Sequence, residues 1–110
     1  MMLPNAAYAF IDIAKISGYC LNLSHPEGRH KARVFQSALG IGEKDSQLLY
    51  NAILKAVAEN QAHLTEADQF GTRYIVDFEL SVNGRSATVR TGWIVRTKED
   101  FARLTTCYIL

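Results

Sequence analysis

The sequence predicts an α+β fold, with N-terminal helices packed on one face of a C-terminal antiparallel sheet of about four strands. The first observation is a change of hydrophobic period, from about 3.6 residues before Gln61 to about 2 residues after it. The second is an Asn83-Gly84 dipeptide between two alternating segments, a strong hairpin signal because both central residues of a type I′ turn need positive φ. A chain of 110 residues suits one ordinary domain and is too short for two, so we expect 1–110 to be a single domain.

Two helices are expected in the first half of the chain. The first covers about 29–39, where apolar residues share one helical face, and Gly40 follows as a natural stop. The second covers about 43–59 and carries a longer apolar stripe, formed by Leu48, Leu49, Ala52, Ile53, Ala56 and Val57. Acidic Glu43 and Asp45 suit the positive N-terminal end of that helix.

The segment before these helices carries a weaker pattern. A short strand at 11–13 is expected to lead into a helical turn at 14–16, which Gly18 ends. The sequence assigns no role to residues 1–18.

Residues 24–28 are expected to form a loop. Pro26 disfavours helical backbone at the residue before it, and Gly28 frees the chain to turn. Ser24 and Glu27 also have the spacing of a helix capping box, which is the alternative.

Four strands are expected in the second half, over 62–67, 74–82, 86–96 and 103–109. If Asn83-Gly84 is a two-residue turn, it fixes every pairing of the two long strands, including Asp77 with Arg90 and Glu79 with Thr88. Those pairs lie opposite one consistent apolar face, formed by Tyr74, Val76, Phe78, Leu80 and Val82 together with Ala87, Val89, Thr91 and Trp93.

The same register bears on two aromatic residues. Trp93 falls on the apolar face, and Tyr108 shares an expected face with Leu104, so the register favours a core position for both. A bulge in either strand would reverse these assignments, because a slip of one residue moves each side chain to the other face.

Composition excludes several classes of protein. With 48% hydrophobic and 21% charged residues the chain has an ordinary globular composition, and no segment is disordered by composition. Two cysteines far apart exclude a disulfide scaffold. No signal-peptide pattern and no run of about 20 apolar residues is present, which favours a cytoplasmic protein without a membrane span.

The net charge of +1 is not that of a strong nucleic-acid binder, but the charges are unevenly distributed. Segments 29–33 and 85–103 are basic, and segment 43–68 is acidic. We expect the basic segments on one side of the molecule, with Lys31 and Arg90 close enough to hold one phosphate, and the acidic segment turned away. The alternative is scattered, solvated charge.

No cofactor or metal is expected. The three histidines and two cysteines lack metal-ligand spacing, and the chain has no GxxxxGK[ST], GxGxxG or GxSxG motif. A metal-free polar cluster is the remaining candidate for chemistry. His30 suits acid–base catalysis, and Lys31 or Arg90 would offset charge developing on a phosphate. The alternatives are a solvated surface for His30 and Lys31, and a cross-strand ion pair with Asp77 for Arg90.

Several runs of the sequence resemble an uncharacterised bacterial domain family. Tyr19-Cys20-Leu21-Asn22, His25-Pro26, Gly28, Lys31-Ala32 and Phe35 resemble its opening pattern YLLNPxHPxGxxKAxFF. Segments 70–76, 89–94 and 102–108 resemble its later patterns GxxYVV, VRSVWxI and PRLVTAYP. The resemblance spans residues 19–108 and keeps the order of the motifs.

The layout of that family resembles the barnase–EndoU–colicin–RelE group of ribonuclease folds, whose similar domains occur in bacterial toxins. The resemblance implies a metal-independent endoribonuclease that cuts RNA to a 2′,3′-cyclic phosphate, with RNA and a small antitoxin or immunity protein as partners. It implies that Lys31 and Arg90 hold the scissile phosphate, that His30 or Tyr108 moves protons, and that Trp93 stacks a base. Further substrate contacts implied by matching positions are Arg73, Thr91, Arg103 and Thr106. The alternative is a non-enzymatic module of the same fold that binds a small partner protein.

Overall fold

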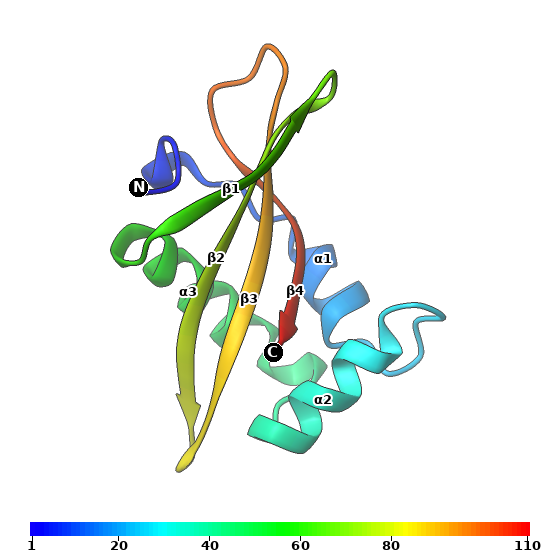
Figure 1. Ribbon diagram of the computed structural model, residues 1–110. Coiled ribbons are helices and arrows are strands. Elements are labelled where there is room, and N and C mark those ends of the chain that lie inside the picture. Colours follow the sequence, from blue (N-terminus) through cyan, green and yellow to red (C-terminus); the bar gives the residue numbers. More distant parts are fainter.

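Four antiparallel strands form one sheet in the order β1-β2-β3-β4, which is also their order in the chain (Figure 1). The computed structural model describes all of residues 1–110. The strands are β1 (Ala62–Asp68), β2 (Gly71–Val82), β3 (Arg85–Arg96) and β4 (Arg103–Ile109). The helices precede the strands, which confirms the predicted α+β class.

The two predicted helices are confirmed. Helix α2 covers Arg29–Leu39, and it ends at Gly40, whose φ of 70° is left-handed. The second begins with a 3₁₀ turn, η3 (Glu43–Asp45), and continues as α3 (Ser46–Glu59). The Asp45 carboxylate accepts a hydrogen bond from the Gly42 N–H at 3.0 Å, which fixes this tight entry.

The N-terminal segment differs from its prediction. It forms a 3₁₀ turn η1 (Ala6–Tyr8), a short helix α1 (Ile13–Lys15) and a π-helical turn η2 (Ile16–Cys20). The Asp12 side chain accepts from the Ala14 N–H and so starts a helix where a strand was expected. Gly18 lies inside η2 and does not end it. The only β-type pairing of this segment is a single parallel bridge between Phe10, just before the expected strand, and Arg103.

The β2–β3 register is confirmed at every predicted pair. Asn83 and Gly84 have φ of 50° and 83°, as a type I′ turn requires. Val82 pairs with Arg85, and Asp77 pairs with Arg90. Strand β2 begins at Gly71, earlier than predicted, because its pairing with β1 and β3 extends to that residue.

Strand β4 contains a bulge that reverses one expectation. Gly92 pairs with Thr106 and Trp93 pairs with Leu104, so Thr105 is an extra residue on β4. Leu104 therefore faces the core, whereas Tyr108, paired with Arg90, faces the opposite side of the sheet. The expectation that Tyr108 shares a face with Leu104 is wrong for this reason.

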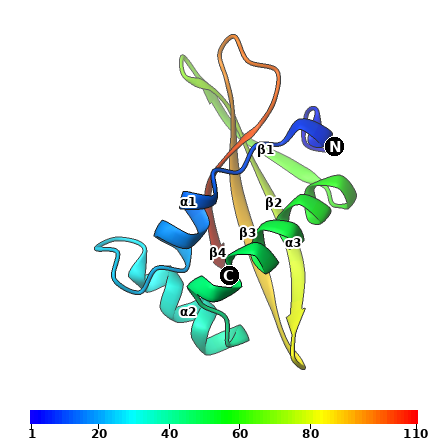
Figure 2. The same ribbon diagram turned by 180° about the vertical axis from the view of Figure 1, so that it is seen from behind.

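The helices cover only one face of the sheet. In Figure 2, α3 and α1 lie in front of the sheet, whereas in Figure 1 the strands are in front with no helix over them. The covered face holds the core, in which Phe35 from α2, Ile53 from α3, and Val76 and Trp93 from the sheet are at most 1% exposed. The predicted core position of Trp93 is confirmed. We call the opposite, uncovered side the outer face.

The lower part of β2 has a free edge. Strand β1 pairs with β2 only between Gly71 and Val76, so nothing is hydrogen-bonded beside residues 78–82 on that side (Figure 1). Backbone groups alternate in direction along an antiparallel ladder, and those of Glu79 and Ser81 point away from β3. These groups are available to another strand.

Gly28 has a different role from the one expected. Its φ is −73°, so it needs no glycine-specific backbone. A Cβ at this position would lie 2.2 Å from the Tyr19 carbonyl oxygen. Gly28 thus allows the start of α2 to approach η2 closely, and this approach places Tyr19 beside α2.

Substitution Gly28→Ala is expected to lower the free energy of unfolding by about 1–3 kcal/mol, because the added methyl group overpacks the contact with Tyr19. Chemical denaturation of the purified variant measures this loss. Gly42→Ala is the control, since a Cβ at Gly42 meets nothing within 4 Å. Equal stabilities of the two variants would contradict this account of Gly28.

Candidate functional site

A hollow of about 400 Å³ opens between α2 and β4. Residues His30, Lys31 and Val34 of α2 form one side, and Tyr108 and Ile109 of β4 form the other. The structure therefore brings together three of the four residues predicted to be catalytic. Tyr108 reaches this place only because the bulge turns it outward.

Lys31 is held between two tyrosines. Its Nζ donates a hydrogen bond of 3.1 Å to the Tyr19 hydroxyl and lies 5.0 Å from the centre of the Tyr19 ring. The centre of the Tyr108 ring is 6.0 Å away. Such contacts attract the ammonium group to the ring faces. Lys31 forms no ion pair, so its charge is not neutralised by a carboxylate.

His30 is the second residue of α2 and is exposed to solvent. Its imidazole makes no hydrogen bond with another side chain or with the backbone. With Arg29 and Lys31 it gives the first turn of α2 only basic side chains, which add to the positive end of the helix dipole. The imidazole is therefore accessible to a molecule in the hollow.

Arg90 adjoins the site but is neutralised. Its Nε and Nη2 donate to the two carboxylate oxygens of Asp77 at 2.9 Å and 2.8 Å, and both side chains are about 30% exposed. The hydrogen bonds from Arg90 hold the pKa of Asp77 below its usual range, and they raise the pKa of Arg90 in turn. Tyr108 pairs with Arg90 across β3 and β4 and adds to this rise. Lys31 and Arg90 thus both adjoin Tyr108.

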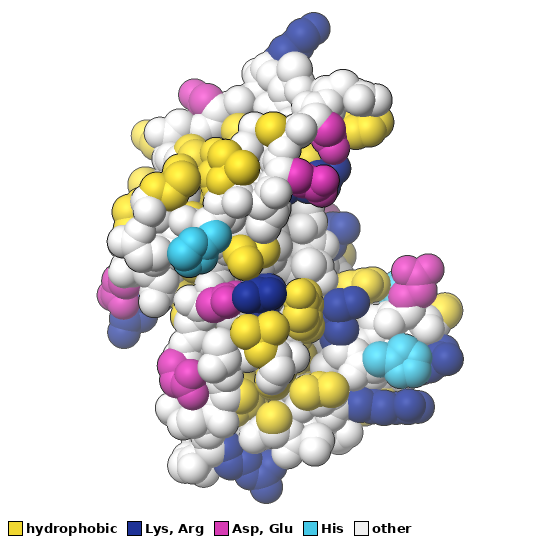
Figure 3. All heavy atoms as spheres, in the orientation of Figure 1, with side chains coloured by type: hydrophobic (Ala, Val, Ile, Leu, Met, Phe, Trp, Pro, Cys, Tyr) yellow, Lys and Arg dark blue, Asp and Glu magenta, His cyan; other side chains and the backbone are white.

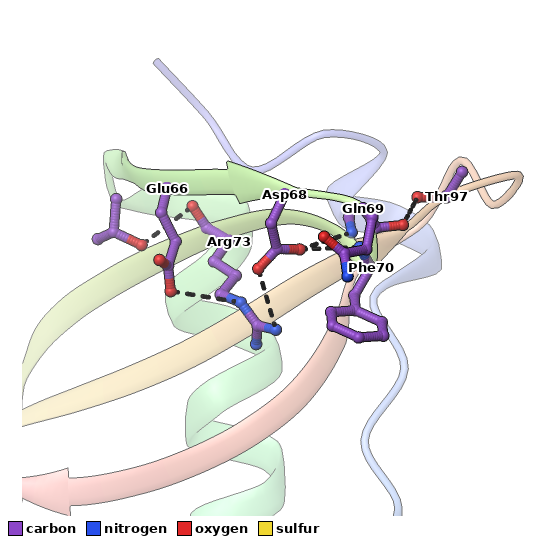
Figure 4. Close-up of polar contacts among 8 residues, drawn as sticks. Glu66, Asp68, Gln69, Phe70, Arg73 and Thr97 are labelled. Atoms are coloured by element: carbon purple, nitrogen blue, oxygen red, sulfur yellow. Dashed lines mark hydrogen bonds and ion pairs between the residues drawn. The ribbon is translucent and has the colours of Figure 1, made fainter.

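Two other predicted substrate contacts are also bound to carboxylates. Arg73 forms ion pairs with Glu66 at 3.4 Å and Asp68 at 3.8 Å at the far end of β1 and β2 (Figure 4). Arg103 makes two hydrogen bonds to Glu99, of 3.0 Å and 2.8 Å. Neither lines the hollow.

Of the remaining predicted contacts, Thr91 and Trp93 lie in the core and Thr106 lies on the outer face. Thr91 is fully buried, where its hydroxyl donates to the Val76 carbonyl and accepts from the Trp93 indole. Trp93 is 1% exposed, so its ring has no free face for a base. Thr106 is half-buried on the outer face, and its hydroxyl oxygen has no hydrogen-bond partner.

The expected separation of charge is found only in part. Basic side chains gather around α2, at the lower right of Figure 3. However, Glu66 and Asp68 of the acidic segment lie on the outer face, because they pair with Arg73. Arg85, which belongs to the basic segment 85–103, does not join the other basic residues of that segment on the outer face but extends toward Gly40 beside the helices. The prediction that the whole acidic segment is turned away is wrong, since β1 contributes two of its acids to this face.

Sequence reasoning missed Tyr19 as part of the site. Its ring also meets the His25 ring edge-on, with centroids 4.8 Å apart. His25 Nδ1 accepts from the backbone N–H groups of Glu27 and Gly28, which braces the loop before α2. The signal in the sequence was the run from Tyr19 to Asn22, but nothing in that run indicates contact with Lys31.

Two buried thiols lie beneath the site. Cys20 follows Tyr19, Cys107 precedes Tyr108, and the two thiols are unbridged and hydrogen-bonded to each other. This hydrogen bond lowers the pKa of Cys20, whereas the hydrogen bond and burial raise the pKa of Cys107. No group of three or more histidine, cysteine, aspartate or glutamate side chains is arranged to hold a metal ion. None of the helices is both long enough and apolar enough to span a membrane.

The chain belongs to the family described as "Domain of unknown function (DUF6883)", whose model matches residues 2–110. Its fold is similar to that of a chain in the contact-dependent growth inhibition toxin–immunity protein complex from Klebsiella pneumoniae 342. The TM-score is 0.66 at 16% sequence identity, and the match covers 91% of this chain and 98% of that chain. At this identity the likeness shows a shared fold. No curated protein matches the sequence significantly.

Substitution Asp77→Asn is expected to destabilise the protein above about pH 5 and to have progressively less effect as pH falls below the ordinary aspartate pKa of about 3.9. Because Arg90 lowers the pKa of Asp77 in the folded state, the stabilisation is fully present above the ordinary aspartate pKa of about 3.9. It is lost as pH falls through the lower folded-state pKa. Urea unfolding at a series of pH values measures the difference.

Arg90→Gln should give the same pH profile, and the double variant should lose no more than either single variant. A destabilisation that is independent of pH would show that the ion pair is not the source of the effect.

Proposed function

We propose that the protein is a metal-independent endoribonuclease of bacterial toxin type, which cleaves RNA to a 2′,3′-cyclic phosphate. The observation that carries the proposal is the hollow at which an unpaired ammonium, a free imidazole and a phenol converge, contributed by Lys31, His30 and Tyr108. These groups suit the binding of an anion and the transfer of protons. The shared fold with a chain of a toxin–immunity protein complex supports the toxin setting.

The proposed reaction needs two proton transfers and one stabilised anion. His30 removes the proton from the 2′-hydroxyl, whose oxygen attacks the adjacent phosphorus while the bond from phosphorus to the 5′-oxygen breaks. The Tyr108 hydroxyl donates a proton to that leaving oxygen. The Lys31 ammonium offsets the charge that develops on the phosphoryl oxygens.

Arg90 has a supporting role in this proposal. Because Asp77 neutralises its charge, it offers less attraction for phosphate than Lys31 does. Its place beside Tyr108 suits it to orient the phenol. Arg73 and Arg103 would be peripheral contacts with a longer RNA, whereas the Thr106 hydroxyl is buried and would not reach it.

Substitution Lys31→Ala is expected to reduce the rate of RNA cleavage about a hundredfold or more, because it removes the charge that stabilises the transition state. Gel assays on labelled RNA in the presence of a chelator measure the rate, and mass spectrometry identifies the cyclic phosphate. Lys55→Ala is the matched control, since Lys55 is exposed on α3 and lies outside the hollow. Absence of cleavage by the unmodified protein, or products without a cyclic phosphate, would refute the proposed reaction.

Expression of the chain alone in bacteria is expected to arrest growth, and His30→Ala should relieve the arrest without unfolding the protein, as checked by circular dichroism. His30 is exposed and makes no polar contact that the fold needs. Normal growth at a high level of soluble, folded protein would remove the toxin proposal.

A second candidate is a non-enzymatic module that binds a small partner protein. The free edge of β2 favours it, since an added strand can pair with the backbone of Glu79 and Ser81. Beside this edge, α3 and β2 form a second hollow of about 440 Å³, in which Ala52, Ala56 and Phe78 would receive apolar side chains. Binding of a protein encoded beside this chain that is lost in Ser81→Pro and kept in Ser81→Ala would support this candidate, because only proline removes the edge N–H.

A further inference from the structure

The hollow between α2 and β4 joins an aromatic wall to an unpaired cation. We propose that it binds one unpaired nucleotide of single-stranded RNA, with the base stacked on the Tyr108 ring and the adjoining phosphate held by Lys31. This inference rests on the proposed function and names the form of RNA that the site takes. It also assigns the base platform to Tyr108, because Trp93 is buried.

The walls of the hollow suit a flat, partly apolar group. Tyr108 and Ile109 are half-buried on β4, and Val34 is 44% exposed on α2. A cavity of about 400 Å³ lies within the range that accepts a small organic ligand such as one nucleotide. Bases of every kind stack on aromatic side chains, because each base has a π-face.

The charge beside the wall suits a phosphate. Lys31 Nζ lies 6.0 Å from the centre of the Tyr108 ring, so a group bound against the ring is within reach of the ammonium. The hydrogen bond to Tyr19 uses one of the three ammonium protons and leaves the others for a ligand. In contrast, Arg73, Arg90 and Arg103 each already have a carboxylate partner.

The geometry favours an unpaired base over a duplex. In a double helix each base is stacked between neighbours and paired along its edge, so neither face can meet a side chain. A nucleotide in a loop or a single strand presents its base without that cost.

Binding of a short single-stranded 2′-O-methyl oligonucleotide, which lacks the attacking hydroxyl, tests the inference separately from cleavage. Fluorescence anisotropy at fixed ionic strength is expected to show about tenfold or greater loss of affinity for Tyr108→Ala. Tyr108→Phe keeps the ring and should bind within about twofold of the unmodified protein. Tyr8→Ala is the matched control, since Tyr8 is 75% exposed and lies outside the hollow.

A second variant tests the inference even if Tyr108→Ala fails to fold. Val34→Glu places a carboxylate at an exposed helix position in the hollow, and repulsion of the phosphate should weaken binding about fivefold or more at low salt. The same sequence presented as a duplex should bind at least about tenfold more weakly than the single strand.

Two results would overturn the inference: equal binding of single strand and duplex, or unchanged binding in both Tyr108→Ala and Val34→Glu. The proposed function can fail separately. Tyr108-dependent binding of the single strand without cleavage of unmodified RNA would leave the nucleotide site in place and remove the nuclease. Cleavage of unmodified RNA together with binding that does not depend on Tyr108 would support the nuclease and remove the nucleotide site.

Discussion

The continuous pairing of β2 with β3 is the constraint on which the rest of the molecule depends. Each residue from Gly71 to Val82 has a partner on β3, without a break, and the turn at Asn83 and Gly84 sets this alignment. The alignment sends Val76, Thr91 and Trp93 toward the helices and leaves Asp77 and Arg90 outside. Both the core and the charges of the outer face follow from it, since a slip of one residue would exchange them.

The basic side chains on and beside the outer face differ in whether their charge is open to a ligand. Arg90 and Arg103 are each held by two hydrogen bonds to one carboxylate, and Arg73 lies between two acids. A planar guanidinium matches a carboxylate in this way, whereas an ammonium does not. Lys31 is instead surrounded by aromatic rings, which attract it without neutralising it. The cation open to a ligand is therefore the lysine and not the nearby arginine.

Prediction from sequence succeeded where one local signal fixed many positions. The dipeptide Asn83-Gly84 and the alternation before it were sufficient for the whole hairpin, the core position of Trp93 and the pairing of Asp77 with Arg90. Prediction failed around residues 1–24, where Phe10 pairs with β4 through a single isolated bridge and η2 is a π-turn packed on β4. Such structure depends on tertiary contacts, which leave little periodicity in the sequence.

The candidate site was predictable in its members but not in its geometry. Resemblance and residue chemistry drew attention to His30, Lys31, Arg90 and Tyr108. The bulge at Thr105 could not be predicted, because a run of two threonines suits either face of a sheet. The contact of Lys31 with Tyr19 could not be predicted either, because it depends on how closely η2 approaches α2 at Gly28.

The bulge has a consequence for how this chain can vary in length. Thr105 and Thr106 both crowd the space above Gly92, where a Cβ would lie 3.0 Å from each of their side chains. Deleting one of these threonines would remove the bulge and leave a regular ladder, in which every remaining residue of β4 keeps its partner on β3. Cys107 would stay opposite Thr91 in the core, and Tyr108 would stay opposite Arg90 on the outer face. The chain can therefore lose one residue at this point without exchanging the thiol and the phenol between the two faces of the sheet.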